Sequence, residues 1–253
     1  MRIVQTIGEL DLPRNGVGLV PTMGALHAGH VRLLETARGA SDTLVASVFV
    51  NPAQFGDARD LAVYRRDLDR DAAIAEEAGV DILFAPDAAE LYPPGFATWV
   101  VPEGVADGLE GAARPGHFRG VATVCLKLFN IVRPQRAWFG RKDAQQVAVL
   151  KQLVRDLNLG IEIRVVDTVR DADGLALSSR NARLSPDERA VALAIPRALA
   201  TRNVDEARAA LAAAGVEPEY VAIADLDGPT LAVAARVGST RLIDNVLLEG
   251  DPL

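Results

Sequence analysis

The stretch that decides the fold is Val17-Gly18-Leu19-Val20-Pro21-Thr22-Met23-Gly24-Ala25-Leu26-His27-Ala28-Gly29-His30. Its apolar run, Val17 to Val20, predicts a buried strand that ends at Pro21, and a helix is expected from Gly29 or His30 to about Arg38. Residues 44–50 predict a second buried strand. Strand, helix and strand in this order form a βαβ unit, which requires a parallel sheet and a right-handed crossover.

The turn between the first strand and its helix holds two of the three histidines of the chain. A helix start offers unpaired N–H groups and the positive end of the helix dipole, which suits a phosphate. Gly24 and Gly29 let the backbone approach a ligand closely. His27 and His30 share one face of the first turn, where an imidazole can donate hydrogen bonds to phosphoryl oxygens in a transition state. The alternative is that both only cap or pack the turn, but their place after a buried strand favours function.

Length and composition describe a globular chain. Its 253 residues are 49% hydrophobic, enough for one large domain or two smaller ones. The formal net charge of −7 gives no electrostatic footprint for nucleic acid. The single cysteine, Cys125, excludes an intrachain disulfide and lies on an apolar helical stripe, so we expect a buried, inert thiol. We find no signal peptide and no apolar stretch near the roughly 18 residues of a membrane span, and therefore expect a soluble cytoplasmic protein.

Polar residues also follow other predicted strands. Asn51 and Gln54 come after residues 44–50, where they can face the same crevice as the histidines, although Asn-Pro is also ordinary turn chemistry. Lys142 follows the predicted strand 137–140 and can pair with a phosphate. Asp143 and Gln146 fit a capping box as well as they fit a binding role.

Two loops carry less decisive signals. Residues 114–120 combine the third histidine with two arginines, which fits an anion-contacting loop or simply an exposed one. Residues 175–181 mix hydroxyl groups with Arg180, which suits a mobile loop that closes over phosphate, or a surface linker. Further strands are expected at 82–85, 98–101, 161–166, 220–224, 231–235 and 241–248. Further helices are expected at 59–78, around Cys125, from about 143 to 157, from 185 to about Pro196, and from 203 to 215.

The βα rhythm up to about Val166 then gives way to two helices and a short, antiparallel sheet. We therefore predict an α/β fold, a Rossmann-like doubly wound parallel sheet in residues 1–170, and a smaller C-terminal α+β domain in residues 171–253. The sequence contains neither a Gly-x-Gly-x-x-Gly fingerprint nor a Walker-type loop, which argues against a dinucleotide oxidoreductase and a P-loop ATPase. The histidine turn with the later Ser/Arg and Lys segments indicates nucleotidyl transfer instead, in which charge accumulates on phosphoryl oxygens.

Four segments in order resemble the pantoate–β-alanine ligase family, over about residues 3–185 and again from Thr240 to Asn245. The segments are Pro21-Thr22-Met23-Gly24-Ala25-Leu26-His27-x-Gly-His30, Phe49-Val50-Asn51-Pro52-x-Gln54-Phe55, Phe139-Gly140-x-Lys142-Asp143-x-Gln145-Gln146 and Asp173-Gly174-Leu175-Ala176-x-Ser178-Ser179-Arg180-Asn181. The resemblance implies a ligase that adenylates pantoate with ATP, releases pyrophosphate, and lets β-alanine attack the acyl adenylate to give pantothenate and AMP. It also implies Mg²⁺ with ATP, and a homodimer.

The resemblance implies a role for each matching residue. The catalytic residues would be His30, His27, Lys142 and Arg180, of which Lys142 and Arg180 would hold the phosphates. Gln54 and Gln146 would bind pantoate and β-alanine. Residues 171–253 would form a lid over an ATP- and pantoate-binding domain. The ATP site would comprise Met23, Gly24, Ala25, Leu26, His27, Ala28, Gly29, His30, Gly140, Arg141, Lys142, Asp143, Val169, Leu177, Ser178, Ser179 and Arg180.

The chain departs from the family pattern in places. The family commonly has Glu where this chain has Arg141, and an acidic cluster that lies near the metal in some relatives is interrupted here by Arg70, with Asp71 kept. The metal ligands are therefore left open. Two other hypotheses remain: an adenylyltransferase acting on a phosphorylated acceptor, and a non-catalytic nucleotide-binding regulator. The neutral amides of Gln54 and Gln146 suit a hydroxy acid better than a second phosphate, and a regulator would not need Lys142 and both histidines.

Overall fold

The computed structural model describes residues 1–56 and 61–248. It divides the chain into two compact units: unit 1 comprises Met1–Phe139 and Ala148–Val166, and unit 2 comprises Gly140–Val147 and Asp167–Leu253. The expected division into functional domains at residue 170 stays a prediction, and residues 249–253 of its second domain lie outside the described residues.

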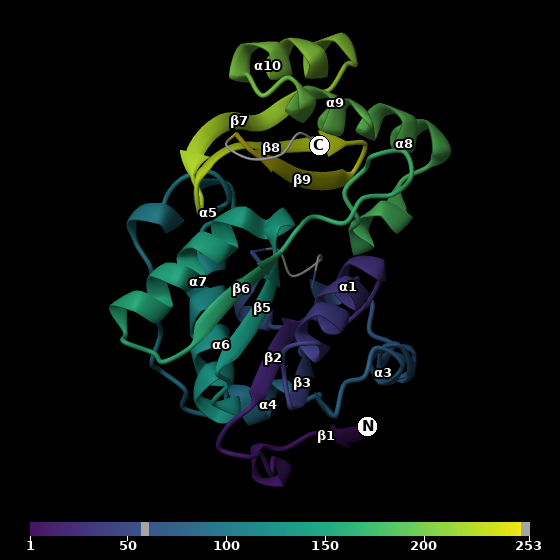
Figure 1. The fold of residues 1–253 in the computed structure, drawn as a ribbon. Coiled ribbons are helices and arrows are strands. Elements are labelled where there is room, and N and C mark those ends of the chain that lie inside the picture. The colour runs from purple at the N-terminus through teal and green to yellow at the C-terminus, as the bar shows by residue number, and fades with distance from the viewer. Residues whose placement is uncertain (57–60, 249–253) are drawn as a thin grey trace. The chain divides into compact units, whose positions relative to one another are not determined.

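Unit 1 is built on a six-stranded sheet with the order β1-β4-β3-β2-β5-β6 (Figure 1). β2 pairs in parallel with β3 and β5, and β4 pairs in parallel with β1 and β3. The strand order reverses at β2, the position where open α/β sheets bind ligands at the carboxyl ends of their strands. The predicted doubly wound parallel sheet is confirmed. The strands span Arg2–Val4 (β1), Val17–Thr22 (β2), Thr43–Val48 (β3), Ile82–Phe84 (β4), Arg136–Gly140 (β5) and Glu162–Val166 (β6).

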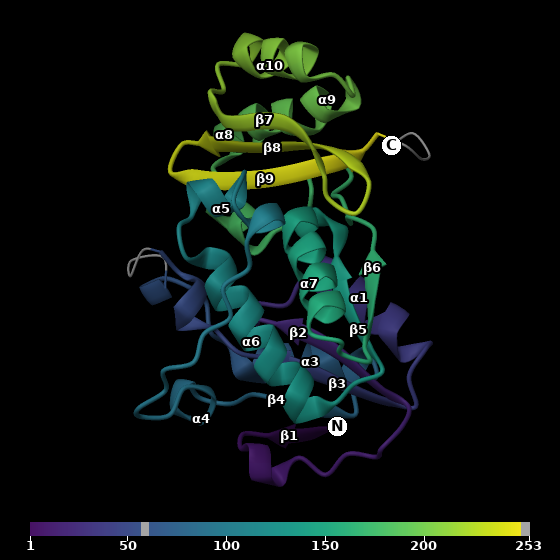
Figure 2. The ribbon, with the colours of Figure 1, turned by 90° about the vertical axis from the view of Figure 1, so that its left-hand side faces the viewer.

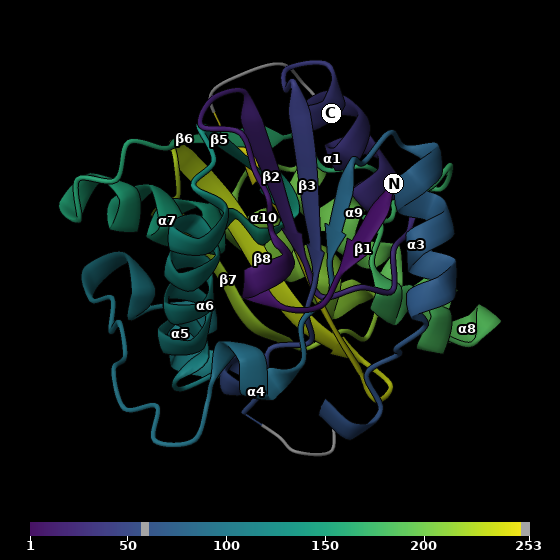
Figure 3. The same ribbon diagram turned by 90° about the horizontal axis from the view of Figure 1, so that it is seen from below.

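Helices cover both faces of this sheet (Figures 2 and 3). On one face lie α1 (Ala28–Arg38) and α3 (Leu68–Glu77), whose buried side chains pack against those of β2, β3 and β4. On the other lie α6 (His117–Val132) and α7 (Ala144–Asp156). Shorter elements of unit 1 are η1 (Ile7–Glu9), η2 (Pro52–Gln54), α4 (Ala88–Leu91), η3 (Gly104–Ala106) and α5 (Glu110–Ala113), whereas η4 (Arg141–Asp143) belongs to unit 2. No helix within 1–56 or 61–248 has the length and apolarity needed to cross a membrane.

Unit 2 contains a three-stranded antiparallel sheet of order β7-β8-β9, with helices packed on one face of it (Figure 2). Its core joins Ile195, Leu199 and Leu211 of the helices to Leu231 and Val233 of β8. The break expected at Pro196 falls instead at Leu193, between α8 and α9, because Pro196 lies in the first turn of α9, where its missing N–H removes no helix hydrogen bond. The elements are η5 (Ser179–Arg183), α8 (Pro186–Ala192), α9 (Ala194–Ala200), α10 (Val204–Ala213), β7 (Pro218–Asp225), β8 (Pro229–Val237) and β9 (Thr240–Leu247). This is the smaller α+β unit that the sequence predicts.

Two element boundaries differ from expectation. β2 does not end at Pro21 but continues to Thr22, because β5 pairs only with Gly18 and Leu19, so proline lies beyond that edge of the ladder. The helix expected over 59–78 is interrupted: residues 61–62 are helical, residues 65–67 are not, and α3 begins at Leu68, where Asp67 caps it by accepting from the Arg70 N–H. Residues 59–60 of that prediction lie outside the described residues.

Long-range contacts overturn two further expectations. Residues 98–101 form no strand: the N–H of Val100 donates to the Thr123 hydroxyl at 3.0 Å, and the Trp99 ring lies 3.9 Å from the Arg119 guanidinium. The loop expected over 114–120 is only partly a loop, because α6 already begins at His117. Cys125 is buried in α6 as predicted, and burial raises the pKa of its thiol to about 12.

Candidate active site

The turn after β2 holds an unusual backbone conformation. Gly24 has φ 80° and Ala25 has φ 53°, so two consecutive residues are left-handed, which is strained for alanine. The carboxylate of Asp71, on α3, holds this turn: its two oxygens accept the N–H groups of Ala25 and Leu26, each at 2.8 Å. Asp71 is 1% exposed. A Cβ on Gly24 would lie 2.7 Å from Asp71 Oδ2, which explains the glycine.

The two histidines cap the helix that follows. His27 is the N-cap of α1, and its Nδ1 accepts the N–H of Gly29 at 3.1 Å. The Nδ1 of His30 accepts the N–H of His27 at 3.3 Å, and the two ring centroids are 4.2 Å apart. Because each Nδ1 accepts, the proton of each neutral ring is on Nε2. Capping and function are therefore compatible: the caps fix the tautomer that makes Nε2 a hydrogen-bond donor.

A hydrogen-bond chain fixes the amide of Gln54. Asn51 Oδ1 accepts the N–H of Ala53 and its Nδ2 donates to the carbonyl of Gly120, so the orientation of that amide is determined. Asn51 Nδ2 then donates to Gln54 Oε1 at 2.9 Å, and Tyr92 donates its hydroxyl to Asn51 Oδ1 at 2.9 Å. Gln54 consequently presents Nε2, a donor, which lies 3.1 Å from Met23 Sδ at the β2 turn.

The basic segment 114–120 supports this same loop. His117 Nδ1 lies 3.0 Å from the carbonyl oxygen of Gln54, and Arg114 Nη1 lies 3.1 Å from His117 Nε2. Arg114 is also paired with Glu110 at 3.6 Å. A Cβ on Gly120 would lie 2.4 Å from the carbonyl oxygen of Ala53. These contacts give the third histidine a structural function that the sequence left undecided.

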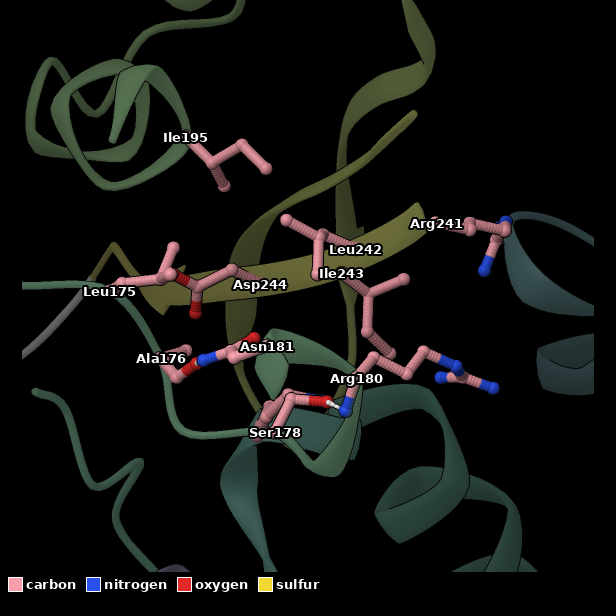
Figure 4. A pocket seen from close by; sticks show the side chains of 11 residues that line it. Leu175, Ala176, Ser178, Arg180, Asn181, Ile195, Arg241, Leu242, Ile243 and Asp244 are labelled. Atoms are coloured by element: carbon pink, nitrogen blue, oxygen red, sulfur yellow. Dashed lines mark hydrogen bonds between the residues drawn. The ribbon is translucent and has the colours of Figure 1, made fainter. Parts of the chain in front are cut away.

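In unit 2, residues of four segments line one pocket: Lys142, the loop with Ser178 and Arg180, Ile195 of α9, and β9. Figure 4 labels the residues of the last three segments. Ser178 caps η5, its Oγ accepting the N–H of Arg180 at 3.2 Å. The N–H of Leu177 donates to the carbonyl of Val169 at 2.9 Å, so these two predicted site residues lie side by side. The lining includes the cations Lys142, Arg180 and Arg241, together with the hydroxyl of Ser178 and the carboxylate of Asp244, and the cations make this pocket suitable for phosphate.

The remaining predicted residues take different positions. Arg141 pairs with carboxylates of unit 2, Nε with Asp167 at 3.4 Å and Nη1 with Asp227 at 3.8 Å. Asp143 is exposed, and its carboxylate lies 3.8 Å from Lys142 Nζ. Gln146 lies in the first turn of α7 and is partly buried.

A protein-ligated metal site does not emerge from the described residues. Within 1–56 and 61–248 no group of three or more His, Cys, Asp or Glu side chains could hold a metal ion. Asp71, the acidic residue kept from the family's cluster, uses both oxygens on backbone N–H groups. These side chains do not fit a dedicated magnesium cage, and Mg²⁺ bound to a nucleotide commonly uses substrate phosphates and water for most of its ligands.

The sequence alone did not show that Tyr92 and Asp71 support the site. Tyr92 and Asn51 are 41 positions apart, and no local spacing connects them. Asn51 itself was recognisable from its place directly after a strand.

A model of the family described as Pantoate-beta-alanine ligase matches residues 2–247. The chain belongs to the pantoate–β-alanine ligase family. It is therefore a ligase, as the resemblance implied. The pantothenate synthetase of Roseiflexus castenholzii is 50% identical over 277 residues, covering 98% of this chain and 100% of that protein. That of Corynebacterium glutamicum is 52% identical over 265 residues, covering 94% and 95%.

Solved structures of the family agree with the fold. The pantothenate synthetase of Thermus thermophilus superposes with a TM-score of 0.94 at 48% identity, covering 98% of this chain and 99% of that one. The pantoate-beta-alanine ligase of Francisella tularensis, complexed with beta-gamma ATP and beta-alanine, has a TM-score of 0.89 at 37% identity and covers 100% of both chains.

Proposed function

We propose that this ligase condenses pantoate and β-alanine in two steps that share a pantoyl adenylate. In the first, a carboxylate oxygen of pantoate attacks the α-phosphorus of ATP, the bond to the β-phosphate oxygen breaks, and pyrophosphate leaves with the electron pair. In the second, the amine of β-alanine attacks the acyl carbon, the bond to the AMP oxygen breaks, and the nitrogen loses a proton. The products are pantothenate and AMP.

The histidine turn supports the first step. Fixed Nε2–H donors on His27 and His30, placed at the start of α1, suit the negative charge that grows on phosphoryl oxygens. Residues 23–30 are proposed to line the ATP site, apart from the side chain of Leu26, which is buried in the core. Lys142 and Arg180, with Gly140–Asp143, Val169 and Leu177–Ser179, are proposed to hold the nucleotide.

Gln54 is the residue we propose for pantoate. Because Asn51 occupies its Oε1, Gln54 offers a ligand the N–H groups of Nε2, which fit an oxygen that accepts, either a hydroxyl or the carboxylate of pantoate. Gln146 is proposed as its partner in binding pantoate or β-alanine. The Francisella tularensis relative, complexed with beta-gamma ATP and beta-alanine, supports the same substrates for this chain.

Three further properties are proposed on the family alone. Mg²⁺ is expected to accompany ATP as the counter-ion of its phosphates, and no step is assigned to it. The chain is expected to form a homodimer and to act in the cytoplasm. Light scattering on the purified protein tests the dimer, and dependence of the rate on added Mg²⁺ tests the ion.

The observation that carries the proposal is the coincidence of fixed imidazole donors and a fixed amide donor at the carboxyl ends of β2 and β3. The test is pyrophosphate release by purified protein given ATP and pantoate, followed by AMP and pantothenate once β-alanine is added. Pyrophosphate release that does not depend on pantoate and requires a phosphorylated acceptor would favour the adenylyltransferase hypothesis instead. No turnover with any acceptor would favour a regulator.

A further inference from the structure

The segment Thr240–Asn245 resembles the family, yet it has no part in the chemistry proposed above. Three of its residues, Thr240, Asp244 and Asn245, are buried polar side chains, with exposed fractions of 2%, 3% and 5%, and the last two form hydrogen bonds to other segments. Burial of polar groups is unfavourable unless they are hydrogen-bonded. Their partners therefore show what this strand holds in place.

Asn245 holds the backbone that carries Lys142. Its Nδ2 donates to the carbonyl oxygens of Arg141 at 3.0 Å and of Lys142 at 2.9 Å. Those carbonyls belong to η4, a helix of three residues that is too short to stabilise itself. Asn245 is itself fixed, because it lies on β9 in register with Ala232 of β8. Both amide protons are thus used to tie two consecutive peptides to a rigid strand.

The neighbouring residue supports the other side of the same pocket. Asp244 accepts two hydrogen bonds from Arg170, at 2.7 and 3.1 Å, and the N–H of Asn245 donates to Asp244 Oδ1 at 2.8 Å. Arg170 also donates to the carbonyl of Gly174, in the turn that precedes the Ser178–Arg180 loop. Since Lys142 and Arg180 line one pocket within unit 2, β9 anchors the segments of both cations.

We propose that Asn245 is the positioning residue of Lys142: it keeps the lysine where the phosphates of ATP bind, without touching a reacting group. The inference rests on the phosphate-binding role proposed for Lys142. Preorganised charge accelerates a reaction only when it is correctly placed, and a misplacement of about 1 Å can cost on the order of 100-fold.

The test uses substitutions that leave Lys142 intact. Asn245→Asp keeps the shape but replaces both N–H donors with acceptors that face two carbonyl oxygens. Asn245→Ala removes the donors without adding charge, so that misfolding of one variant does not decide the result. The control is Asn203→Ala, in the same unit, which removes the N-cap of α10 and destabilises the chain without contact to η4. Thermal unfolding of each variant measures the loss of stability.

Pantoate-dependent exchange of pyrophosphate into ATP is measured for each variant and for the pairs with Lys142→Ala. We expect both Asn245 variants to lower kcat/KM for ATP by about tenfold or more, whereas N203A leaves it unchanged at an equal loss of Tm. In the Lys142→Ala background the Asn245 substitutions should lower kcat/KM for ATP almost no further. The inference would be overturned if the Asn245 substitutions lowered kcat/KM equally in the wild-type and Lys142→Ala backgrounds. It would also be overturned if they left kcat/KM unchanged while K142A alone lowered it. Unchanged exchange in K142A would instead refute the proposed role of Lys142.

Discussion

The substitution Asp71→Asn tests whether a buried carboxylate shapes the histidine turn. The change is isosteric, yet it removes one of two acceptors and turns an NH₂ group toward a backbone N–H. In the structure both oxygens of Asp71 accept hydrogen bonds, from the N–H groups of Ala25 and Leu26 at 2.8 Å each. Asp71 is only 1% exposed, so no water has room to replace the lost acceptor.

The magnitude follows from those two contacts. A hydrogen bond to a charged group contributes about 1.5–3 kcal/mol, and an unsatisfied buried N–H costs about 1–3 kcal/mol. Part of this is recovered because a neutral amide is easier to bury than a carboxylate. We expect the free energy of unfolding to fall by about 2 kcal/mol, which corresponds to roughly 4–8 °C in Tm. Because Ala25 would leave its left-handed conformation, kcat should also fall about tenfold or more.

The assay combines thermal unfolding with pantoate-dependent pyrophosphate exchange. The matched control is Asp67→Asn, the same change one turn earlier on α3, where asparagine is as good an N-cap as aspartate and the side chain is partly exposed. The control should keep both Tm and kcat. A D71N variant as stable and as active as wild type would refute the claim that this carboxylate holds the turn.

Three further predictions concern individual groups. His30→Ala should lower the rate of pyrophosphate exchange on the order of 100-fold, the cost of losing one positioned donor, while Tm falls by only about 2–4 °C because the cap on the His27 N–H is lost. Gln54→Glu should raise KM for pantoate about tenfold or more in steady-state assays, because a carboxylate replaces the donor that faces the substrate, and an unchanged KM would exclude Gln54 from that site. Burial raises the pKa of Cys125 from 9.0 to about 12 and that of Tyr92 from 10.0 to about 12. Since the unfolded chain releases these protons first, the free energy of unfolding should fall between about pH 9 and 12, and Tyr92→Phe should flatten that fall in urea titrations.

The sequence predicted the elements whose signals are local. Apolar runs predicted the strands of both sheets apart from β1, Arg2–Val4. The helix expected from residue 185 begins there, because Ser185 caps it in a capping box with Glu188. The prediction was wrong at residues 98–101, where Val100 bonds to Thr123 on α6 in place of a strand partner. Such a contact between distant segments leaves no periodic trace in the sequence.

The candidate site was predictable in its residue types but not in its orientation. His27, His30 and Gln54 stand out because they follow buried strands. The tautomer of the imidazoles and the direction of the Gln54 amide depend on hydrogen bonds, one of them reaching through Asn51 to Tyr92. The anchoring of Lys142 by Asn245 spans 103 positions and becomes visible only in the fold.

The central claim is that a carboxylate oxygen of pantoate becomes bonded to the α-phosphorus of ATP. Pantoate labelled with ¹⁸O in its carboxylate tests this directly, with the AMP formed during turnover analysed by mass spectrometry. The mechanism predicts that each AMP carries one ¹⁸O, because the acyl–oxygen bond breaks when β-alanine attacks. Unlabelled AMP, or ADP as the nucleotide product, would contradict the adenylate and with it the proposed function.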